Sequence, residues 1–455
     1  MKKNYLLGMA LMASLSFYSC DKEVVYVQDG NGVESVTDGA QIITLQVENG
    51  GDGLATRAGR PLYSAEAKQT IENVKLWICD NTGKVVYVKE ISDWNTDGST
   101  VYTTGGHGRQ TTIELKDADK LAAGTYKIYA VGYSSNSDYT LDAVTSVAKE
   151  GTFKENMVLP IKDGAANKIG EEIFAGQIME LTVTEGKGFK EPIVLNRQVA
   201  GAFAYVKDIP YMEGAKYLKL VASAQNESLV LGHFNSFDLT GNGSGNDVNV
   251  KYVVNGTNGK SGSETYEISS IDLTQWFTNI ADNDGDNLID AGDNWKNPYS
   301  SEGHPTFQKG SAFGGEFVIP FAHVDGKQTL TLQLTNEGGT VLRSWKVNLG
   351  SADEQLKQTI TCWNSESTDW STSLSGESSN TSLSGESSNT YSLVRNHLYG
   401  IGTRMNDEVD PEQPGVDPDP DPEDPDDKPE SLNNKQELVL KVNDNWEVIH
   451  GMELD

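Results

Sequence analysis

Short apolar runs, many of them alternating with polar residues, recur along this 455-residue chain, and stretches of Gly, Asn, Asp and Ser separate them. Such runs, without long helical segments between them, are typical of β-sandwiches and not of parallel α/β sheets. A chain of this length has room for two ordinary domains. The sequence therefore predicts an all-β fold of two Greek-key-type β-sandwich domains with minor helices. The strand-like runs span residues 74–78, 84–91, 111–115, 125–131, 178–183, 193–206, 218–222, 248–254, 316–320, 328–334, 340–347 and 392–401.

Acidic residues dominate the charge, because 66 Asp and Glu stand against 36 Lys and Arg and give a formal net charge of -30. A nucleic-acid partner requires a basic surface that neutralises phosphates, and this composition supplies none. We therefore expect no nucleic-acid binding. The chain also has only 3 cysteines, one of them in the leader, which is too few for a disulfide framework.

The first 20 residues have the pattern of an export signal. Lys2 and Lys3 precede an uncharged, mostly apolar run that stops at Ser19 and Cys20. The run is too short to span a bilayer. A cysteine at this point predicts a lipoprotein signal peptide in which Cys20 is lipidated, and the lipid would tether a precursor to a membrane. The alternative is a plain secretory signal with an incidental cysteine.

An amphipathic strand pattern follows the leader. Ile43, Leu45 and Val47 alternate with polar residues, and a Gly-rich segment, 49–59, comes next. That segment contains Arg57 and Ala58 and is predicted to be an exposed hinge, where proteolysis concentrates.

The end of the chain combines a tether with a second amphipathic strand. Residues 407–430 hold 7 of the 14 prolines and a large excess of acids, so they are predicted to be extended and solvated. The strand beyond them either folds back onto its own second domain or adds to a sheet edge of another subunit, and the long tether favours the second alternative. Its apolar face consists of Leu438, Leu440, Val442, Trp446 and Val448.

The early strand and the terminal strand are predicted to compete for one kind of groove. In that hypothesis Ile43, Leu45 and Val47 form a plug that blocks assembly while it stays covalently attached. A cut after Arg57 would turn the plug into a dissociable peptide.

The sharpest chemical signal is an acidic loop. Asp282, Asp284, Asp286, Asp290 and Asp293 stand at positions 1, 3, 5, 9 and 12 of an EF-hand-like loop, and the carbonyl of Leu288 stands at position 7. Position 6, usually Gly, is Asn287, a residue that tolerates a left-handed backbone. Converging carboxylates repel without a cation, so we predict a structural Ca²⁺ site, with a solvated acidic turn as the alternative. Apolar residues at helical spacing, 273–280, predict a short helix just before the loop.

Catalytic motifs are absent from the sequence. The six histidines are scattered without metal-ligand spacing, and no GxSxG, HExxH or GxxxxGK[ST] motif occurs. Carboxylate pairs are too frequent in this acidic chain to identify a glycosidase. We therefore expect a protein that is not an enzyme, and a secreted hydrolase is the least favoured alternative.

These features divide the chain into six segments, with the boundary between the two domains near Val206. We predict a lipoprotein signal peptide at 1–20, a propeptide with the plug strand at 21–57, an N-terminal β-sandwich domain at 58–206, a C-terminal β-sandwich domain with the acidic loop at 207–406, an acidic Pro-rich linker at 407–430 and a donor strand at 431–455.

The order of several weak motifs resembles a known family. They are the leader ending in Ser19 and Cys20, the segment 56–59, and the stretches 124–133, 172–176, 195–200 and 395–399, followed by a terminal strand with Trp446. Together they are similar to the fimbrillins, or type V pilins, of Bacteroidales, and the similarity covers nearly the whole chain.

The resemblance implies a life cycle. Precursors of this family reach the outer membrane as lipoproteins, an Arg-specific protease cleaves after a hinge arginine, and subunits polymerise by strand donation into a surface fimbrium. Cys20 then corresponds to the lipid site, and Arg57 to the residue before the cut. The implied partners are other copies and related pilins, the protease, and an unidentified host or bacterial surface ligand for adhesion. The alternative is a non-polymerising outer-membrane surface lipoprotein, such as an anchor, adhesin or glycan-binding protein.

Overall fold

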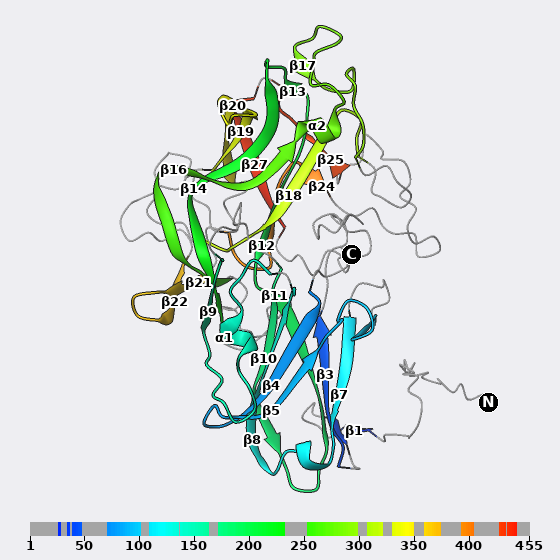
Figure 1. Ribbon diagram of the computed structural model, residues 1–455, viewed down its shortest axis with the longest axis vertical. Helices are drawn as coiled ribbons and strands as arrows, with labels where there is room; N and C mark the ends of the chain where they lie inside the picture. Colours follow the sequence, from blue (N-terminus) through cyan, green and yellow to red (C-terminus); the bar gives the residue numbers. More distant parts are fainter. Residues whose placement is uncertain are drawn as a thin grey trace, which may run out of the picture.

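A computed structural model describes residues 26–28, 34–36, 39–47, 71–101, 109–135, 137–162, 172–232, 253–298, 307–321, 330–349, 359–374, 393–404, 427–433 and 435–443. Strands account for 58% of the structure and helices for 4%, which confirms the predicted fold class. Two lobes lie one above the other along the long axis (Figure 1). Within the described residues, no helix is long and apolar enough to cross a membrane.

The lower lobe contains an eight-stranded sheet. Its two halves are joined by only two residue pairs between β10 and β11, so the strands fold over into two layers. Ile43, Leu76, Ile128 and Leu195 are among the fully buried side chains of the core between the layers. In order, the strands are β5 (Val85–Ile91), β4 (Asn73–Asp80), β8 (Gly124–Tyr133), β10 (Phe174–Val183), β11 (Phe189–Arg197), β3 (Gln41–Val47), β7 (Arg109–Leu115) and β6 (Thr100–Val101).

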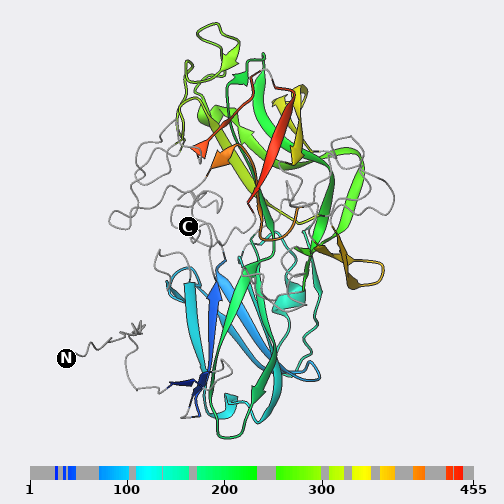
Figure 2. The same cartoon turned by 180° about the vertical axis from the view of Figure 1, so that it is seen from behind.

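The upper lobe is built on a ten-stranded sheet, seen from behind in Figure 2. Its core contains the fully buried Trp276, Trp345 and Tyr399. The main path runs through β16 (Gly256–Asp272), β14 (Ala215–Leu231), β19 (Leu330–Asn336), β20 (Val341–Leu349), β27 (Glu437–Asn443), β23 (Leu398–Ile401), β12 (Ala200–Lys207) and β18 (Ala312–Val318), with β26 (Glu430–Ser431) on β12 and β9 (Met157–Pro160) on β14.

Short elements complete the fold. Small sheets pair β1 (Tyr26–Gln28) with β2 (Glu34–Val36), β13 (Ile209–Pro210) with β17 (Leu288–Ile289), and β24 (Thr403–Arg404) with β25 (Asp427–Lys428), while β21 (Thr359–Asn364) lies between β15 (Val253–Val254) and β22 (Asp369–Leu374). The helices are α1 (Asp142–Thr145), α2 (Leu273–Trp276) and the 3₁₀ turn Asp117–Asp119. The predicted short helix before the acidic loop is α2, and Asp272 caps it by accepting a hydrogen bond from the N–H of Thr274.

The chain passes from the first sheet to the second earlier than the sequence predicted. The run 193–206 was expected to be one strand ending at the domain boundary, but it forms β11 up to Arg197 and β12 from Ala200. The break allows each half to pair with a different sheet, because the backbone N–H of Gln198 turns to the carbonyl of Ile173 and that of Asn396 bonds the carbonyl of Val199. Strand β12 therefore belongs to the second sheet, which also includes the earlier β9, and the last strand of the first sheet ends at Arg197.

The predicted solvated linker 407–430 is also corrected at its C-terminal end. Asp427–Lys428 pairs with β24, and Glu430–Ser431 pairs with β12. The charge pattern changes at Lys428, and the neighbouring Pro429 and Leu432 are both buried. Burial of these two residues supplies the apolar contact that holds this end of the segment to the body.

Candidate functional site

Strand β3, the predicted plug, lies inside the first sheet. It pairs parallel with β11, with Leu45 opposite Ile193, and antiparallel with β7, with Ile43 opposite Ile113. Because β11 and β7 meet only through β3 in the sheet order, its removal would open a gap between them. Figure 1 shows β3 standing between neighbours that come much later in the chain.

The core-facing side chains of β3 are fully buried. Ile43, Leu45 and Val47 each have 0% exposure and belong to the core of the first sandwich. Burying a large aliphatic side chain contributes about 1.5–3 kcal/mol, so the three residues are a substantial part of the stability of this lobe. The alternation seen in the sequence thus corresponds to a core strand.

Both ends of the side-chain amide of Gln41 bond the same backbone residue. Gln41 Nε2 donates to the carbonyl of Leu121 at 2.9 Å, and the N–H of Leu121 donates to Gln41 Oε1 at 2.7 Å. Gln41 is 5% exposed. This pair fixes the first residue of β3 against the loop that follows β7. The two residues lie 80 positions apart in the sequence, so no local pattern could have identified the contact.

Other predicted residues near the N-terminus fall outside the described part of the chain. These are Cys20, the proposed lipid site, and Arg57 and Ala58, the proposed cleavage position. Their roles remain predictions from the sequence.

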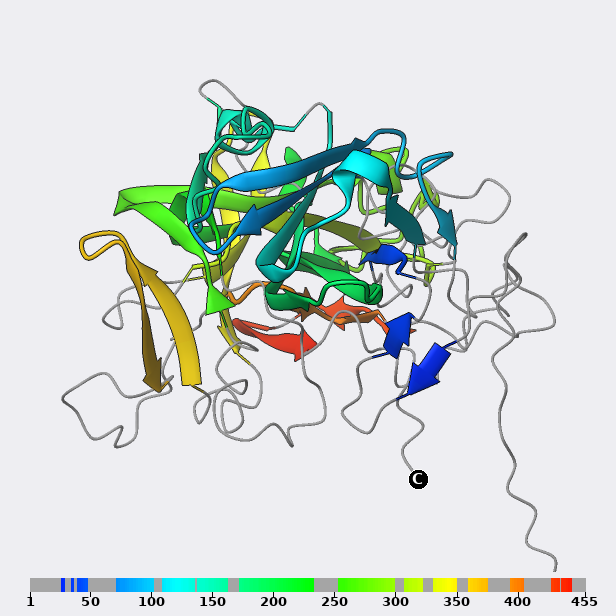
Figure 3. The ribbon, with the colours of Figure 1, turned by 90° about the horizontal axis from the view of Figure 1, so that it is seen from below.

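The predicted donor strand, β27, pairs within its own chain. It runs parallel to β20, with Leu438 opposite Val347, and antiparallel to β23, with Val442 opposite Tyr399. Leu438 is 1% exposed and joins the core of the second lobe. In the single chain the strand therefore has the position of the fold-back alternative, shown in red in Figure 3. Leu440 also lies in β27, whereas Trp446 and Val448 are outside the described residues.

Strands β3 and β27 have the same pairing polarity. Each has one parallel neighbour, β11 or β20, and one antiparallel neighbour, β7 or β23. An extended strand is accepted by a sheet only if its direction satisfies both edges. The two strands are therefore equivalent in direction as well as in sequence pattern.

The acidic loop is a closed turn held by its own carboxylates. The side chain of Asp282 accepts backbone hydrogen bonds from Gly285 at 2.7 Å, Asp286 at 3.1 Å and Asn287 at 2.9 Å. Asn287 has a φ of 68°. Position 6 of the loop therefore has the left-handed backbone that the usual glycine of an EF-hand-like loop adopts there. The strand pair of β17 with β13 fastens the far side of the loop to the body, with Leu288 opposite Pro210.

The carboxylate at position 12 is the most buried of the five. Asp293 is 8% exposed, and its Oδ1 accepts from the backbone N–H of Asn283 at 2.8 Å. Its Oδ2 accepts from the N–H of Asp290 at 2.9 Å. Asp293 therefore links the second and the ninth positions of the loop to the twelfth.

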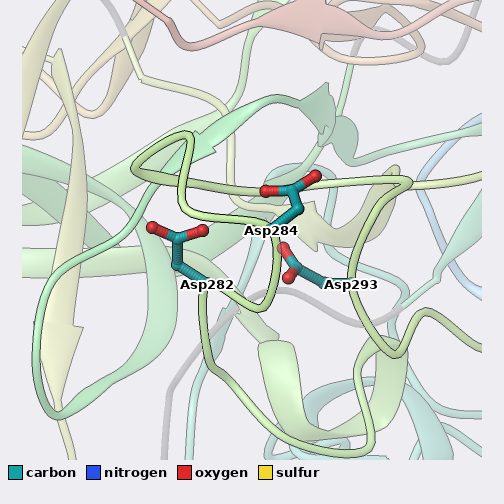
Figure 4. A group of neighbouring side chains, drawn as sticks. All are labelled: Asp282, Asp284 and Asp293. Carbon is teal, nitrogen blue, oxygen red and sulfur yellow. The ribbon is translucent and has the colours of Figure 1, made fainter.

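The five carboxylates form two overlapping groups. Oxygen atoms of Asp282, Asp284 and Asp293 lie within 4.8 Å of one another, and so do those of Asp284, Asp286 and Asp290. Figure 4 shows the first group gathered around one turn. Calcium takes oxygen ligands at about 2.3–2.6 Å, so ligands on opposite sides of the ion are about 5 Å apart. The donor type and the spacing therefore fit Ca²⁺.

Asp284 belongs to both carboxylate groups of the loop. Desolvation, together with the charges of Asp286, Asp293 and Asp282, raises the pKa of this carboxyl above its ordinary value. A cation among the carboxylates would reverse this effect by favouring the ionised form.

The family model of the fimbrillin-A associated anchor proteins Mfa1 and Mfa2 matches residues 43–298, more than half of the chain. No curated protein matches the sequence. The match begins at Ile43 in β3 and ends after the acidic loop, so it includes both of these features.

Among solved structures, the tip fimbrial protein Mfa3 of Porphyromonas gingivalis, with a C-terminal truncation, is 11% identical; the alignment covers 81% of this chain and 96% of that one with a TM-score of 0.38. The fimbrial anchor protein Mfa2 of the same organism is 12% identical, with coverages of 73% and 95% and a TM-score of 0.32. A fimbrial assembly protein of Parabacteroides distasonis is 12% identical, with coverages of 73% and 99% and a TM-score of 0.33.

Proposed function

The chain belongs to the family of fimbrillin-A associated anchor proteins Mfa1 and Mfa2, a Bacteroidales fimbrillin family, and from this premise we propose that it is a structural subunit of a surface fimbrium. The family membership supports a fimbrial or cell-surface protein that associates with other fimbrial subunits. The finer proposal is that copies assemble by strand exchange after cleavage at Arg57.

One observation carries the proposal: β3 is a buried central strand that precedes the predicted cleavage position. While the chain is intact, β3 competes for its groove at an effective concentration near millimolar, set by the connecting segment. A cut after Arg57 removes that advantage, because residues before the cut become a separate peptide that leaves on dilution. The mature subunit then has an open groove between β11 and β7.

The terminal strand β27 is the proposed occupant of that groove. Its apolar pattern and its pairing polarity match those of β3. Strands β25 and β26 hold residues 427–431 to the same lobe, so they must leave together with β27 before the segment 405–426 can act as a tether. An extended chain of that length would reach on the order of 70 Å at about 3.1 Å per residue. We propose that the position of β27 in its own lobe is the stored state, and that β27 leaves it when the groove of another copy opens.

The proposed precursor is an exported lipoprotein. Cys20 would carry the lipid that holds it at the outer membrane, and an Arg-specific protease would release the subunit for assembly at the surface. In the assembled fimbrium the subunit would support adhesion to a surface ligand. Its position in the fimbrium would decide whether it acts as a shaft, tip or anchor subunit. The precursor has no proposed catalytic residue.

Protease treatment of the purified precursor tests the proposal. We expect an Arg-specific protease to produce ladders that resist denaturant, with a mature N-terminus at Ala58. The Arg57→Lys chain is the matched control, since it keeps the charge but not the cleavage position, and it is expected to stay monomeric. A cleaved wild-type chain that remains a monomer at high concentration would refute strand exchange and support the lone surface lipoprotein.

We also propose that the acidic loop binds Ca²⁺ as a structural ion. The support is the spacing of Asp282, Asp284 and Asp293 and of the second group that shares Asp284. The ion would neutralise the repulsion at Asp284 and stiffen the connection between α2 and β17.

A further inference from the structure

We propose that Gln436 sets the register in which the terminal strand enters a neighbouring copy, by taking the place that Gln41 holds in the first sheet. The inference rests on the strand exchange proposed above and adds the alignment of the two chains. The contact would form between Gln436 of one copy and Leu121 of the copy that accepts its strand.

Seven residues of the two strands correspond position by position. The plug reads QIITLQV over 41–47, and the tail reads QELVLKV over 436–442. The first, fifth and seventh residues are identical, and Leu438 stands where Ile43 stands. The donor thus presents an amide, then three large aliphatic residues at every second position, as the plug does.

Any other alignment of the donor in the groove would expose apolar side chains or bury polar ones. A shift of one residue turns the apolar face of the donor to solvent. A shift of two residues in one direction places Asp444 at the position of Val47, and a shift of two in the other places Gln436 at that of Ile43. Both positions are fully buried, so each shift would bury a polar group or a charge in an apolar core. The alignment of Gln436 with Gln41 avoids this cost.

The contact of Gln41 explains why an amide is required. Leu121 offers one N–H and one carbonyl to this side chain, and a glutamine has both a matching acceptor and a matching donor. In its own lobe Gln436 is exposed, while its backbone carbonyl accepts from the N–H of Lys346 at 3.1 Å. The side chain is therefore accessible for a new contact when the strand moves.

The outward positions favour the donor over the plug. Thr44 is 8% exposed, and within the described residues its hydroxyl has no hydrogen-bond partner. Val439 takes its place in the donor, with a similar shape and no hydroxyl, so the exchange removes a buried unpaired polar group. Two residues on, Gln46 Nε2 donates to Gln110 Oε1 at 3.3 Å, and Lys441 brings another nitrogen donor to that position.

Cysteine pairing measures the register. In β7, Thr112 lies opposite Thr44, so it should lie opposite Val439 of the donating copy. We would place Thr112→Cys in one chain with Val439→Cys, and compare chains that combine Thr112→Cys with Glu437→Cys or Lys441→Cys. After cleavage and mild oxidation, we expect the Val439→Cys chain to form at least about tenfold more intermolecular disulfide than either shifted chain. The single substitutions control for reaction of the native Cys79 and Cys362.

The outcomes separate the two proposals. Ladders that cross-link mainly through position 437 or 441 would overturn the register and leave strand exchange intact. A cleaved wild-type chain without ladders would overturn both. We further expect Gln436→Leu to lower the ladder yield and the cross-link at 439, whereas Gln41→Leu should change neither in the cleaved protein, because the plug is gone. If the Thr112→Cys, Val439→Cys chain forms the same amount of cross-link with Gln436→Leu as with the native Gln436, the role of the amide is refuted.

Discussion

Arg197 donates two hydrogen bonds to Glu172, from Nε at 3.0 Å and from Nη2 at 2.7 Å, and both reach the same carboxylate oxygen. The two side chains are 2% and 0% exposed. The guanidinium also lies over the rings of Phe174 in the first sheet, at 4.9 Å, and of Phe317 in the second, at 6.0 Å. A buried ion pair therefore marks the junction between the two lobes.

Loss of one partner from this pair is expected to be costly. Glu172→Ala leaves a buried guanidinium without its counter-charge, which typically lowers the free energy of unfolding by about 3–5 kcal/mol. Denaturant unfolding of the full chain measures the change. Glu150→Ala is the control, because Glu150 forms an exposed pair with Lys84 and its loss should change the free energy of unfolding far less. Equal effects of the two substitutions would contradict the structural role of the junction.

Period-two patterns predicted the strands well where one face is buried. The run 111–115 corresponds to β7, and the alternation around Leu45 corresponds to β3. The long strand β16 was missed because Gly, Ser, Asn and Thr fill much of it; its pairing with β14, in which Ser269 lies opposite Leu220, comes from sheet context. The split at Gln198 was missed for a different reason, because the residues on both sides of it have strand character.

Only part of the candidate site could be predicted from the sequence. Side-chain spacing identified the acidic loop and the α2 helix before it. The strands that pair with β27 could not be predicted from the sequence, because an amphipathic strand has the same pattern whether it stays in its own sheet or is donated. The bond between Gln41 and Leu121 depends on tertiary contact alone.

Truncation of the plug core should destabilise the precursor but not the cleaved subunit. Leu45→Ala removes a fully buried side chain from β3 and is expected to lower the free energy of unfolding of the intact chain by about 2–5 kcal/mol. Val341→Ala, at a residue that is 47% exposed, should have little effect. The comparison is made by denaturant unfolding before and after cleavage. A Leu45→Ala effect that persists after cleavage and removal of the peptide would show that β3 does not leave.

Calcium should stabilise the upper lobe through the acidic loop. We expect millimolar Ca²⁺ to raise the Tm of the full chain by several degrees, since a ligand that binds only the folded state at about 100 times its Kd contributes about 2.7 kcal/mol. Asp284→Asn, which removes a charge common to both carboxylate groups, should abolish the shift. The exposed Asp97→Asn chain should keep it. A shift of equal size in the Asp284→Asn chain would assign the ion to another site.

Stability should depend on pH through Glu191, which lies opposite Ile43 in the β11–β3 pair. Burial raises the pKa of Glu191 above its ordinary value of 4.5, because the folded state disfavours the carboxylate. The protonated group therefore contributes stability that is fully present below pH 4.5 and is lost as the pH rises through the folded pKa. Glu191→Gln is expected to match the wild type at pH 4 and to be more stable than the wild type at pH 7 in denaturant unfolding. The exposed Glu180→Gln chain should show no such divergence, and a Glu191→Gln difference that stays constant between the two pH values would contradict the assignment.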